Sequence, residues 1–429
     1  MSAITHAIPN AQTINRTVLA NDVTVLVYEN HAAQSVVIAG SVRVGSVYES
    51  AAHNGLASLT ASALMRGTQN RDFETIHTTL EDAGADVSVR AGTFRTSFSG
   101  KSLAEDLELL VDVTADVLRH PTYPSTQIER LRGELITGLH IRQQDTRYRA
   151  NRAFSEALYP DNHPFHYSVS GTLETVPTLR RDDLTAFHAQ HYGPAGMIIV
   201  VVGAVDTDAA VEIVGRHFAD WQNPNQPANP ELPALTPLPE TVRNVVTLPG
   251  KTQSDVVMGV PGPSRYADDY QAAVLANSVL GQFGMMGRVG AKIREELGLA
   301  YYAYSSVAGG SGPGPWQVSA GINPKNVDLT IARVTDELRR LVTEPVSDED
   351  LEDNQSYYVG RLPLQLESNE GIAGTILSME TYDLGLDYLA NYRDLIFGLT
   401  KDDLMAAAQR YLNPDALVIG LAGPEMVSS

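Results

Sequence analysis

The chain has 429 residues and no cysteine, which excludes disulfides, thiolate metal sites and cysteine nucleophiles. Its 31 Lys and Arg against 51 Asp and Glu give a formal net charge of −20, which argues against nucleic acid and anionic membranes as partners. No basic segment followed by an apolar one opens the sequence, and the longest apolar run, 197–202, is far shorter than the ~18 residues of a membrane helix. We therefore expect a cytoplasmic protein without a signal peptide.

The first part of the chain alternates between strand and helix patterns. Residues 23–28 and 35–44 are rich in β-branched residues and predict two adjacent strands separated by a short polar turn. Residues 55–65 and 73–83 follow with helical periodicity. Residues 86–100 alternate small, apolar and polar residues and predict a hairpin. This order of elements indicates an α+β fold, with a mainly antiparallel sheet and packed helices.

A proline-rich segment divides the sequence into two similar halves. Residues 222–240 contain six prolines and no helical or strand periodicity, so we expect an extended, exposed linker. Residues 107–136 in the first half and 329–358 in the second share one pattern, an amphipathic helix, a proline stop and a second helix. We therefore predict two homologous domains, at 1–221 and 241–429.

One motif in the first half resembles a known zinc-binding signature. Residues 45–68 resemble the N-terminal motif of the M16 peptidases, whose core reads Gly-Leu-Ala-His-x-x-Glu-His-x-x-x-x-Gly-Thr. In that family two histidines four residues apart bind zinc, and the Glu between them polarises the attacking water. Here Ser58 and Ser62 stand at the histidine positions and Ala61 stands at the Glu position. The resemblance therefore implies a degenerate site without metal ligands, and no cofactor in this chain.

No other residues compensate for this loss. The family's third ligand, a glutamate further along the chain, corresponds to about Gly138, and Glu134, one helical turn away, is a lone carboxylate. Two histidine pairs have a three-residue spacing that could place both rings on one helix face, His163 with His166 and His188 with His191. Neither pair has an acidic partner at a suitable offset. We interpret these histidines as polar residues of loops or helix surfaces.

The second half carries a second family motif. Residues 277–306 resemble the M16 C-terminal signature, a glycine turn followed by Arg-x6-Tyr, and the match falls on Arg294 and Tyr301. We expect a helix through 292–297, a stop at Gly298 and then a strand. The resemblance implies that this pair contacts the substrate backbone near the scissile bond. An arginine fork can bind a carbonyl or carboxylate, and a phenol can donate a hydrogen bond to an oxyanion.

A different interpretation of the same residues stays open. An arginine in Arg-Glu-Glu usually lies on a solvated helix face, and a tyrosine that opens a strand usually packs in a sheet. Tyr302 and Tyr304 follow closely, and alternation alone does not choose among the three tyrosines. The spacing in the family motif selects Tyr301.

The resemblance also implies a partner. M16 enzymes are clamshells of four related α+β domains, and a two-domain chain forms half of one. We therefore expect a non-zinc subunit of a heterodimeric peptidase, inactive alone, whose partner has the His-x-x-Glu-His motif and the zinc. The substrate would be an unfolded peptide. Two alternatives remain, a structural subunit and a peptide-binding homodimer without chemistry.

Overall fold

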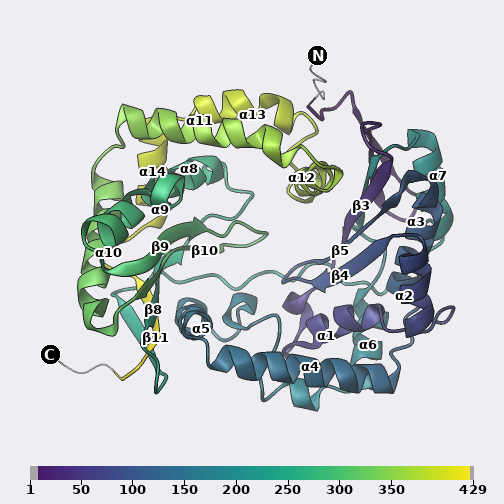
Figure 1. Ribbon diagram of the computed structural model, residues 1–429, viewed down its shortest axis with the longest axis horizontal. Helices are drawn as coiled ribbons and strands as arrows, with labels where there is room; N and C mark the ends of the chain where they lie inside the picture. Colours follow the sequence, from purple (N-terminus) through teal and green to yellow (C-terminus); the bar gives the residue numbers. More distant parts are fainter. Residues whose placement is uncertain (1–7, 426–429) are drawn as a thin grey trace. The chain divides into compact units, whose positions relative to one another are not determined.

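The computed structural model describes residues 8–425, which form two compact units. Residues up to 137, 168–231 and 362–392 form the first unit. Residues 138–167, 232–361 and the part of the chain from 393 form the second. Each unit contains one β-sheet with packed helices (Figure 1). No helix in the described part of the chain is both long and apolar enough to span a membrane.

The first sheet has six strands in the order β1-β2-β6-β3-β5-β4. β2 and β6 are parallel and every other neighbouring pair is antiparallel. The strands are β1 (Ile14–Val18), β2 (Thr24–Glu29), β3 (Ser35–Val42), β4 (Asp86–Ala91), β5 (Thr96–Leu103) and β6 (Ile198–Gly203). β4 and β5 confirm the predicted hairpin.

The predicted pairing of the first two long strands was wrong. β6 lies between β2 and β3 and pairs with both. All six residues of β6 are buried, so this strand requires neighbours on both sides and helices on both faces. β6, which begins at residue 198, therefore occupies the position beside β2 where the sequence pattern predicted β3.

The second sheet repeats this topology with five strands in the order β7-β11-β8-β10-β9. β7 and β11 are parallel, and the remaining pairs are antiparallel, as in β2-β6-β3-β5-β4 of the first sheet. The strands are β7 (Val242–Thr247), β8 (Ser254–Pro261), β9 (Ala300–Val307), β10 (Pro315–Ile322) and β11 (Val418–Gly423). The two α+β units are therefore built on one strand plan.

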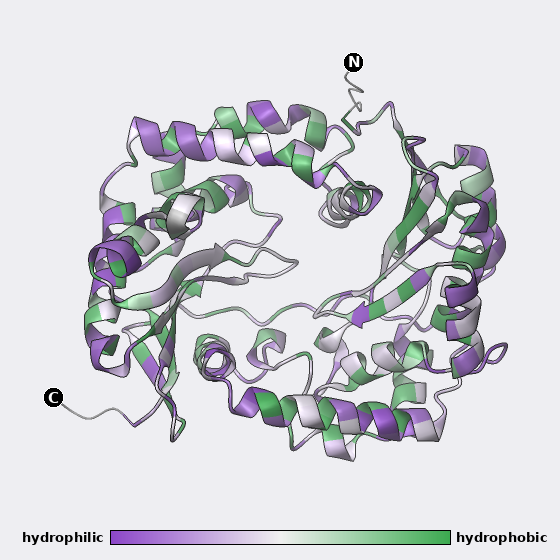
Figure 2. Cartoon of the chain, in the orientation of Figure 1, coloured by the Kyte–Doolittle hydropathy of each residue, from purple (hydrophilic) through white to green (hydrophobic). Residues whose placement is uncertain are grey.

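Helices pack against both sheets. In Figure 2 they carry hydrophilic and hydrophobic residues side by side, whereas β3 is largely hydrophobic. The helices from the first half of the sequence are α1 (Leu56–Leu64), α2 (Phe73–Asp82), α3 (Leu107–Arg119), α4 (Ser125–Gln143), α5 (Thr146–Leu158), α6 (Arg181–His191) and α7 (Thr207–Phe218). Those from the second half are α8 (Tyr270–Gly281), α9 (Phe283–Gly290), α10 (Val327–Thr343), α11 (Asp348–Gln365), α12 (Asn369–Thr381), α13 (Tyr388–Phe397) and α14 (Lys401–Tyr411).

Each unit includes one helix from the other half of the sequence. α12 packs on β3 and β6 of the first sheet, where Ile372 and Ile376 join a core with Val200. α5 packs on β7, β8 and β11 of the second sheet, where its Phe154 joins a core with Val257. The segment 222–240 between the halves contains no helix or strand. The domain boundary at this segment stays a prediction.

Candidate functional site

The helix with the degenerate motif is fixed at its N-terminus by Glu49. The Glu49 carboxylate accepts hydrogen bonds from the backbone N–H groups of Gly55 and Ala57 and from the Asn54 side chain. Gly55 has a φ of +97°, and a Cβ there would lie 2.9 Å from the Gly171 Cα. Burial raises the pKa of Glu49 to about 7, although its three hydrogen-bond donors favour the ionised form. The start of α1 is therefore fixed by hydrogen bonds to Glu49 and by close packing of Gly55 against Gly171.

The residues on α1 do not fit a zinc ion. Ala61 is fully buried in the core and has no donor atom, Ser58 is half-buried and Ser62 is exposed. Protein zinc sites use imidazole, thiolate or carboxylate ligands, and a serine hydroxyl is none of these. Glu134 on α4 instead forms ion pairs with Arg130 and Arg66. Within residues 8–425 no group of three His, Asp or Glu side chains could hold a metal ion, and we assign no zinc-dependent step to this chain.

The histidines of the two pairs pack against or bond to neighbouring residues of the fold. The buried His163 stacks on Tyr159, with 4.8 Å between ring centroids, and its Nδ1 accepts the backbone N–H of Phe165. His188 bonds to the Leu118 carbonyl, and burial lowers its pKa to about 4. His191 is buried as well. The first pair lies in a loop, as expected, but the interpretation as surface residues was wrong for His163 and His191, which are buried.

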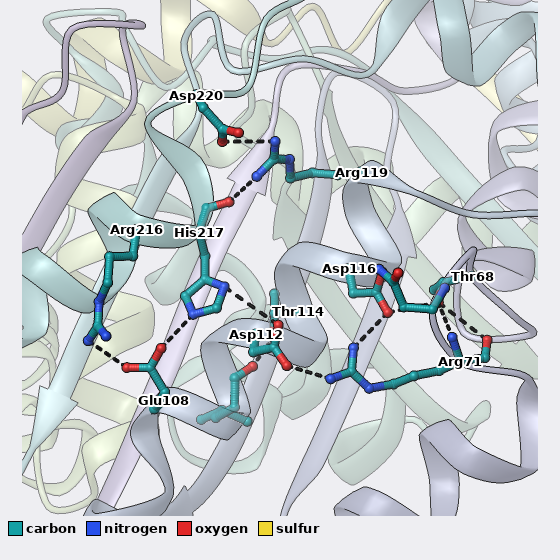
Figure 3. A network of polar contacts seen from close by, with 12 residues as sticks. Thr68, Arg71, Glu108, Asp112, Thr114, Asp116, Arg119, Arg216, His217 and Asp220 are labelled. Atoms are coloured by element: carbon teal, nitrogen blue, oxygen red, sulfur yellow. Dashed lines mark hydrogen bonds and ion pairs between the residues drawn. The ribbon is translucent and has the colours of Figure 1, made fainter.

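The frame around the degenerate motif has a structural role. Thr68, which ends the motif, donates from its hydroxyl to Asp116 of α3 over 2.7 Å. Asp116 is 4% exposed and also accepts from the Asn70 side chain and from Arg71, which pairs with Asp112 as well (Figure 3). One helical turn before Asp112, Glu108 binds His217 and Arg216 of α7 (Figure 3). Thr68 therefore ties the end of α1 to α3 through a buried carboxylate.

The second motif forms a turn between α9 and β9. A short π-helical segment, Ala291–Glu296, carries Arg294 and is anchored by the buried Ile293. Gly298, with a φ of +59°, ends it, and β9 begins two residues later. The predicted helix, stop and strand are confirmed, although the helix is of the π type. Such single turns are frequent at functional sites.

Tyr301 occupies an irregular position in β9. Tyr302 pairs with Gly321 of β10 and Ala300 pairs with Ile322, so Tyr301 is the extra residue of a β-bulge. Its side chain is 80% exposed. A bulge re-aims one side chain relative to the regular pleat and is common beside active sites. The bulge therefore distinguishes Tyr301 from its neighbours, which alternation in the sequence could not do.

Arg294 and Tyr301 lie in the same unit, on either side of the Gly298 turn. Arg294 is half-buried. In the part of the chain that the structure describes, neither the guanidinium nor the Tyr301 hydroxyl forms a hydrogen bond or ion pair. Both groups are therefore available to an added peptide. The roles assigned to them from the motif stay a prediction.

A second polar group in this unit was missed by the sequence analysis. Asp255 of β8 is 1% exposed, and it accepts hydrogen bonds from the hydroxyls of Tyr302 and Thr146 and from the Gln253 side chain. The Arg147 Nε donates to the Tyr302 hydroxyl over 3.0 Å, and its guanidinium carbon lies 4.1 Å from the Tyr302 ring centroid. Burial and the bond to Asp255 raise the pKa of Tyr302. We term these five residues the Asp255 cluster.

Comparisons with known proteins match both halves. A family described as Peptidase M16 inactive domain matches residues 178–358, and one described as Insulinase (Peptidase family M16) matches residues 24–165. An uncharacterized zinc protease of Streptomyces coelicolor is 26% identical over 419 residues, 95% of this chain and 90% of that protein. The beta subunit of the mitochondrial-processing peptidase of Saccharomyces cerevisiae is 22% identical over 455 residues, covering 100% and 94%. The crystal structure of a peptidase M16 inactive domain from Pseudomonas fluorescens has a TM-score of 0.88 at 24% identity, covering 97% and 99%.

Proposed function

Because the chain belongs to peptidase family M16 and its α1 does not offer zinc ligands, we propose that it is the non-zinc subunit of a heterodimeric M16 peptidase. The family and the two-unit α+β fold inferred from the two motifs are confirmed. The role of a substrate-binding subunit is our proposal. The partner chain would carry the His-x-x-Glu-His motif, the zinc ion and the base.

The single observation that carries this proposal is the state of the two motifs. On α1 the side chains that would perform chemistry are replaced by Ser58, Ala61 and Ser62. At the second motif, Arg294 and Tyr301 are present, and the bulge in β9 leaves Tyr301 80% exposed. An exposed phenol at a β-bulge is an arrangement that is common beside binding sites. The difference supports a chain that contributes substrate contacts without metal chemistry.

The chemistry available to the pair is binding and charge stabilisation. The Arg294 guanidinium can donate a hydrogen bond to a backbone carbonyl of the peptide, or two parallel hydrogen bonds to a carboxylate. The Tyr301 hydroxyl can donate to the oxyanion that forms when water attacks the scissile carbonyl. The loss of one such donor typically lowers the rate by ~10²–10³. Neither residue generates the nucleophile, so the chain alone should not hydrolyse peptides.

The test is peptide hydrolysis by three samples, this chain, an M16 relative from the same cell that has the zinc motif, and the two co-purified. Arg294→Ala and Tyr301→Phe versions of this chain are mixed with the same partner, and size-exclusion chromatography checks that each complex forms. We expect cleavage only by the mixture, and a rate lower by about a hundredfold with either substitution.

Two outcomes would contradict the proposal. A mixture no faster than the zinc-bearing relative alone would favour the structural or the peptide-binding alternative. Full activity of the mixture with both substitutions would show that Arg294 and Tyr301 do not contact the reacting peptide. Ser62→Ala, an exposed change on α1, is the matched control and should leave the rate unchanged.

A further inference from the structure

Arg147 is held in one orientation but keeps its terminal nitrogens unused. Its Nε donates to the Tyr302 hydroxyl, and its guanidinium lies 4.1 Å from the centre of the Tyr302 ring. The side chain of this residue is exposed, and no further hydrogen bond or ion pair engages it among residues 8–425. An arginine that is fixed at Nε presents its two terminal nitrogens as a planar fork, which matches the geometry of a carboxylate.

The support behind Arg147 is rigid. The Tyr302 hydroxyl donates to the buried Asp255, which also accepts from Thr146, the residue before Arg147 in α5. The Asp255 carboxylate therefore binds both the phenol of Tyr302 and, through Thr146, the start of α5. Asp255 contacts Tyr302 and not the guanidinium itself, so the charge of Arg147 is only indirectly balanced. Pre-organised donors of this kind bind with a smaller loss of side-chain entropy.

The surrounding charge is unusual for this acidic chain. Residues 140–155 contain four arginines and one aspartate, although Arg152 pairs with the adjacent Glu156, whereas the whole chain has a net charge of −20. That aspartate, Asp145, caps α5 by accepting the backbone N–H of Tyr148. A local excess of positive charge attracts anionic groups that the remainder of the surface repels.

The position of Arg147 relates it to the proposed substrate contacts. Its partner Tyr302 directly follows Tyr301 in β9, the edge strand of the second sheet. Arg147 therefore bonds to the residue that directly follows Tyr301 in the chain.

We propose that Arg147 is a specificity-determining residue that binds a carboxylate of the peptide through its terminal guanidinium nitrogens. The inference rests on the proposed function, because it takes a peptide as the ligand. The carboxylate belongs either to an Asp or Glu side chain or to the C-terminus of the peptide. Tyr302 is a positioning residue, which acts by holding the Arg147 fork against Asp255.

The experiment measures peptide binding by the full chain without its partner, using fluorescence anisotropy. The probe is an unstructured Gly-, Ser- and Leu-containing peptide with an N-terminal fluorophore. In one arm the C-terminus is amidated and Glu or Gln is placed at each position in turn. In the other arm an uncharged peptide carries either a free C-terminal carboxylate or an amide. The two arms distinguish a side-chain carboxylate from a chain-end carboxylate.

We expect one arm to show about tenfold tighter binding of the acidic form than of its neutral isostere, since a charge-assisted hydrogen-bonded pair contributes this much. The preference should decrease with added NaCl because the pair is exposed. Arg147→Gln should abolish the preference. Tyr302→Phe should reduce the preference several-fold.

Arg142→Gln is the matched control. It removes one positive charge from the same segment, where Arg142 lies over the Tyr148 ring and not in the Asp255 cluster. The preference should persist in this variant if the fork, and not the general charge, recognises the carboxylate. Thermal unfolding followed by circular dichroism checks that each variant is folded.

The inference is overturned if the wild-type chain does not distinguish acidic from neutral peptides in either arm, including the case in which none of them binds. It is also overturned if the preference survives Arg147→Gln or disappears in Arg142→Gln. These results are separable from the test of the proposed function. That proposal can fail in hydrolysis by the mixture while the acid preference is present, and the acid preference can be absent while Arg294 and Tyr301 still affect hydrolysis.

Discussion

The helix α1 and the segment that leads into β9 carry the two motifs of the same family and have kept different parts of them. In both, the backbone frame is present, with Gly55 and Gly298 at positive φ. On α1 the positions of the metal ligands and the base hold Ser58, Ala61 and Ser62. In the second motif, the tyrosine is present as Tyr301, which is exposed at the bulge near the start of β9. The backbone frame of a motif is therefore present even where the side chains at its metal-binding positions are replaced.

The largest expected effect concerns the frame at the end of α1. Asp116→Ala should lower the free energy of unfolding by roughly 4 kcal/mol, because it leaves Arg71, Thr68 and Asn70 without their shared buried acceptor. Urea denaturation followed by circular dichroism measures this change. Asp112→Ala is the control, since Asp112 is 37% exposed and should contribute no more than about 1 kcal/mol. Equal effects of the two variants would mean that Thr68 is not held by a buried carboxylate.

Gly55 and Gly298 allow the backbone constraint in the two motifs to be compared, because both have a positive φ. Gly55→Ala should cost about 3 kcal/mol, because a Cβ at this φ would also meet the Gly171 backbone at 2.9 Å. Gly298→Ala should cost only about 1 kcal/mol, because the space around it is open. Thermal and urea unfolding of the two variants give both values. A larger cost at Gly298 would show that the β9 turn is the more constrained of the two.

The next effect is a pH dependence that belongs to α1. The pKa of Glu49 is raised to about 7 in the folded protein, above its ordinary value of 4.5. The folded state therefore binds a proton more tightly, so this contribution to stability is present below pH 4.5 and is lost as the pH rises through 7. We expect a loss of about 3 kcal/mol over this range.

Glu49→Gln is the variant that checks this dependence. It should flatten the difference in unfolding free energy between pH 4.5 and pH 7 while keeping one of the two side-chain oxygens that accept N–H groups at the start of α1. Unfolding free energies of both proteins at several pH values give the comparison. An unchanged pH profile in the variant would assign the dependence to other groups.

The smallest expected effects distinguish neighbouring tyrosines. Tyr302→Phe should lower the free energy of unfolding by about 1–2 kcal/mol, because Asp255 loses a hydrogen-bond donor. Tyr301→Phe should change it by less than about 0.5 kcal/mol, since its hydroxyl is exposed. The same urea titration measures both. A destabilising Tyr301→Phe would favour sheet packing as the role of this residue.

The sequence pattern predicted those elements whose residues lie close together along the chain. The hairpin of β4 and β5 and the helix, stop and strand around Gly298 were visible because each is contained in one short stretch of sequence. The insertion of β6 between β2 and β3 was not, because pairing across more than 150 residues leaves no local signal.

The candidate site was predicted to a similar degree. The spacing of the motif selected Arg294 and Tyr301 as candidates, but the β-bulge at Tyr301 required the register of β9 against β10. The Asp255 cluster joins residues from α5, β8 and β9, and each alone has the pattern of an ordinary helix or strand residue. The concentration of arginines in 140–155 was the one available signal.

The placement of α12 has a consequence for how the protein is made. The first sheet is complete in the chain once β6 has been synthesised, but the apolar face that contains Val200 waits for Ile372 and Ile376. During translation this face therefore stays uncovered while the ribosome adds most of the second half. We expect the nascent chain to need protection by a chaperone during that interval, and a fragment that stops at the proline-rich segment to aggregate. A ribosome-profiling experiment that selects chaperone-bound nascent chains should show engagement ending only after α12 has emerged.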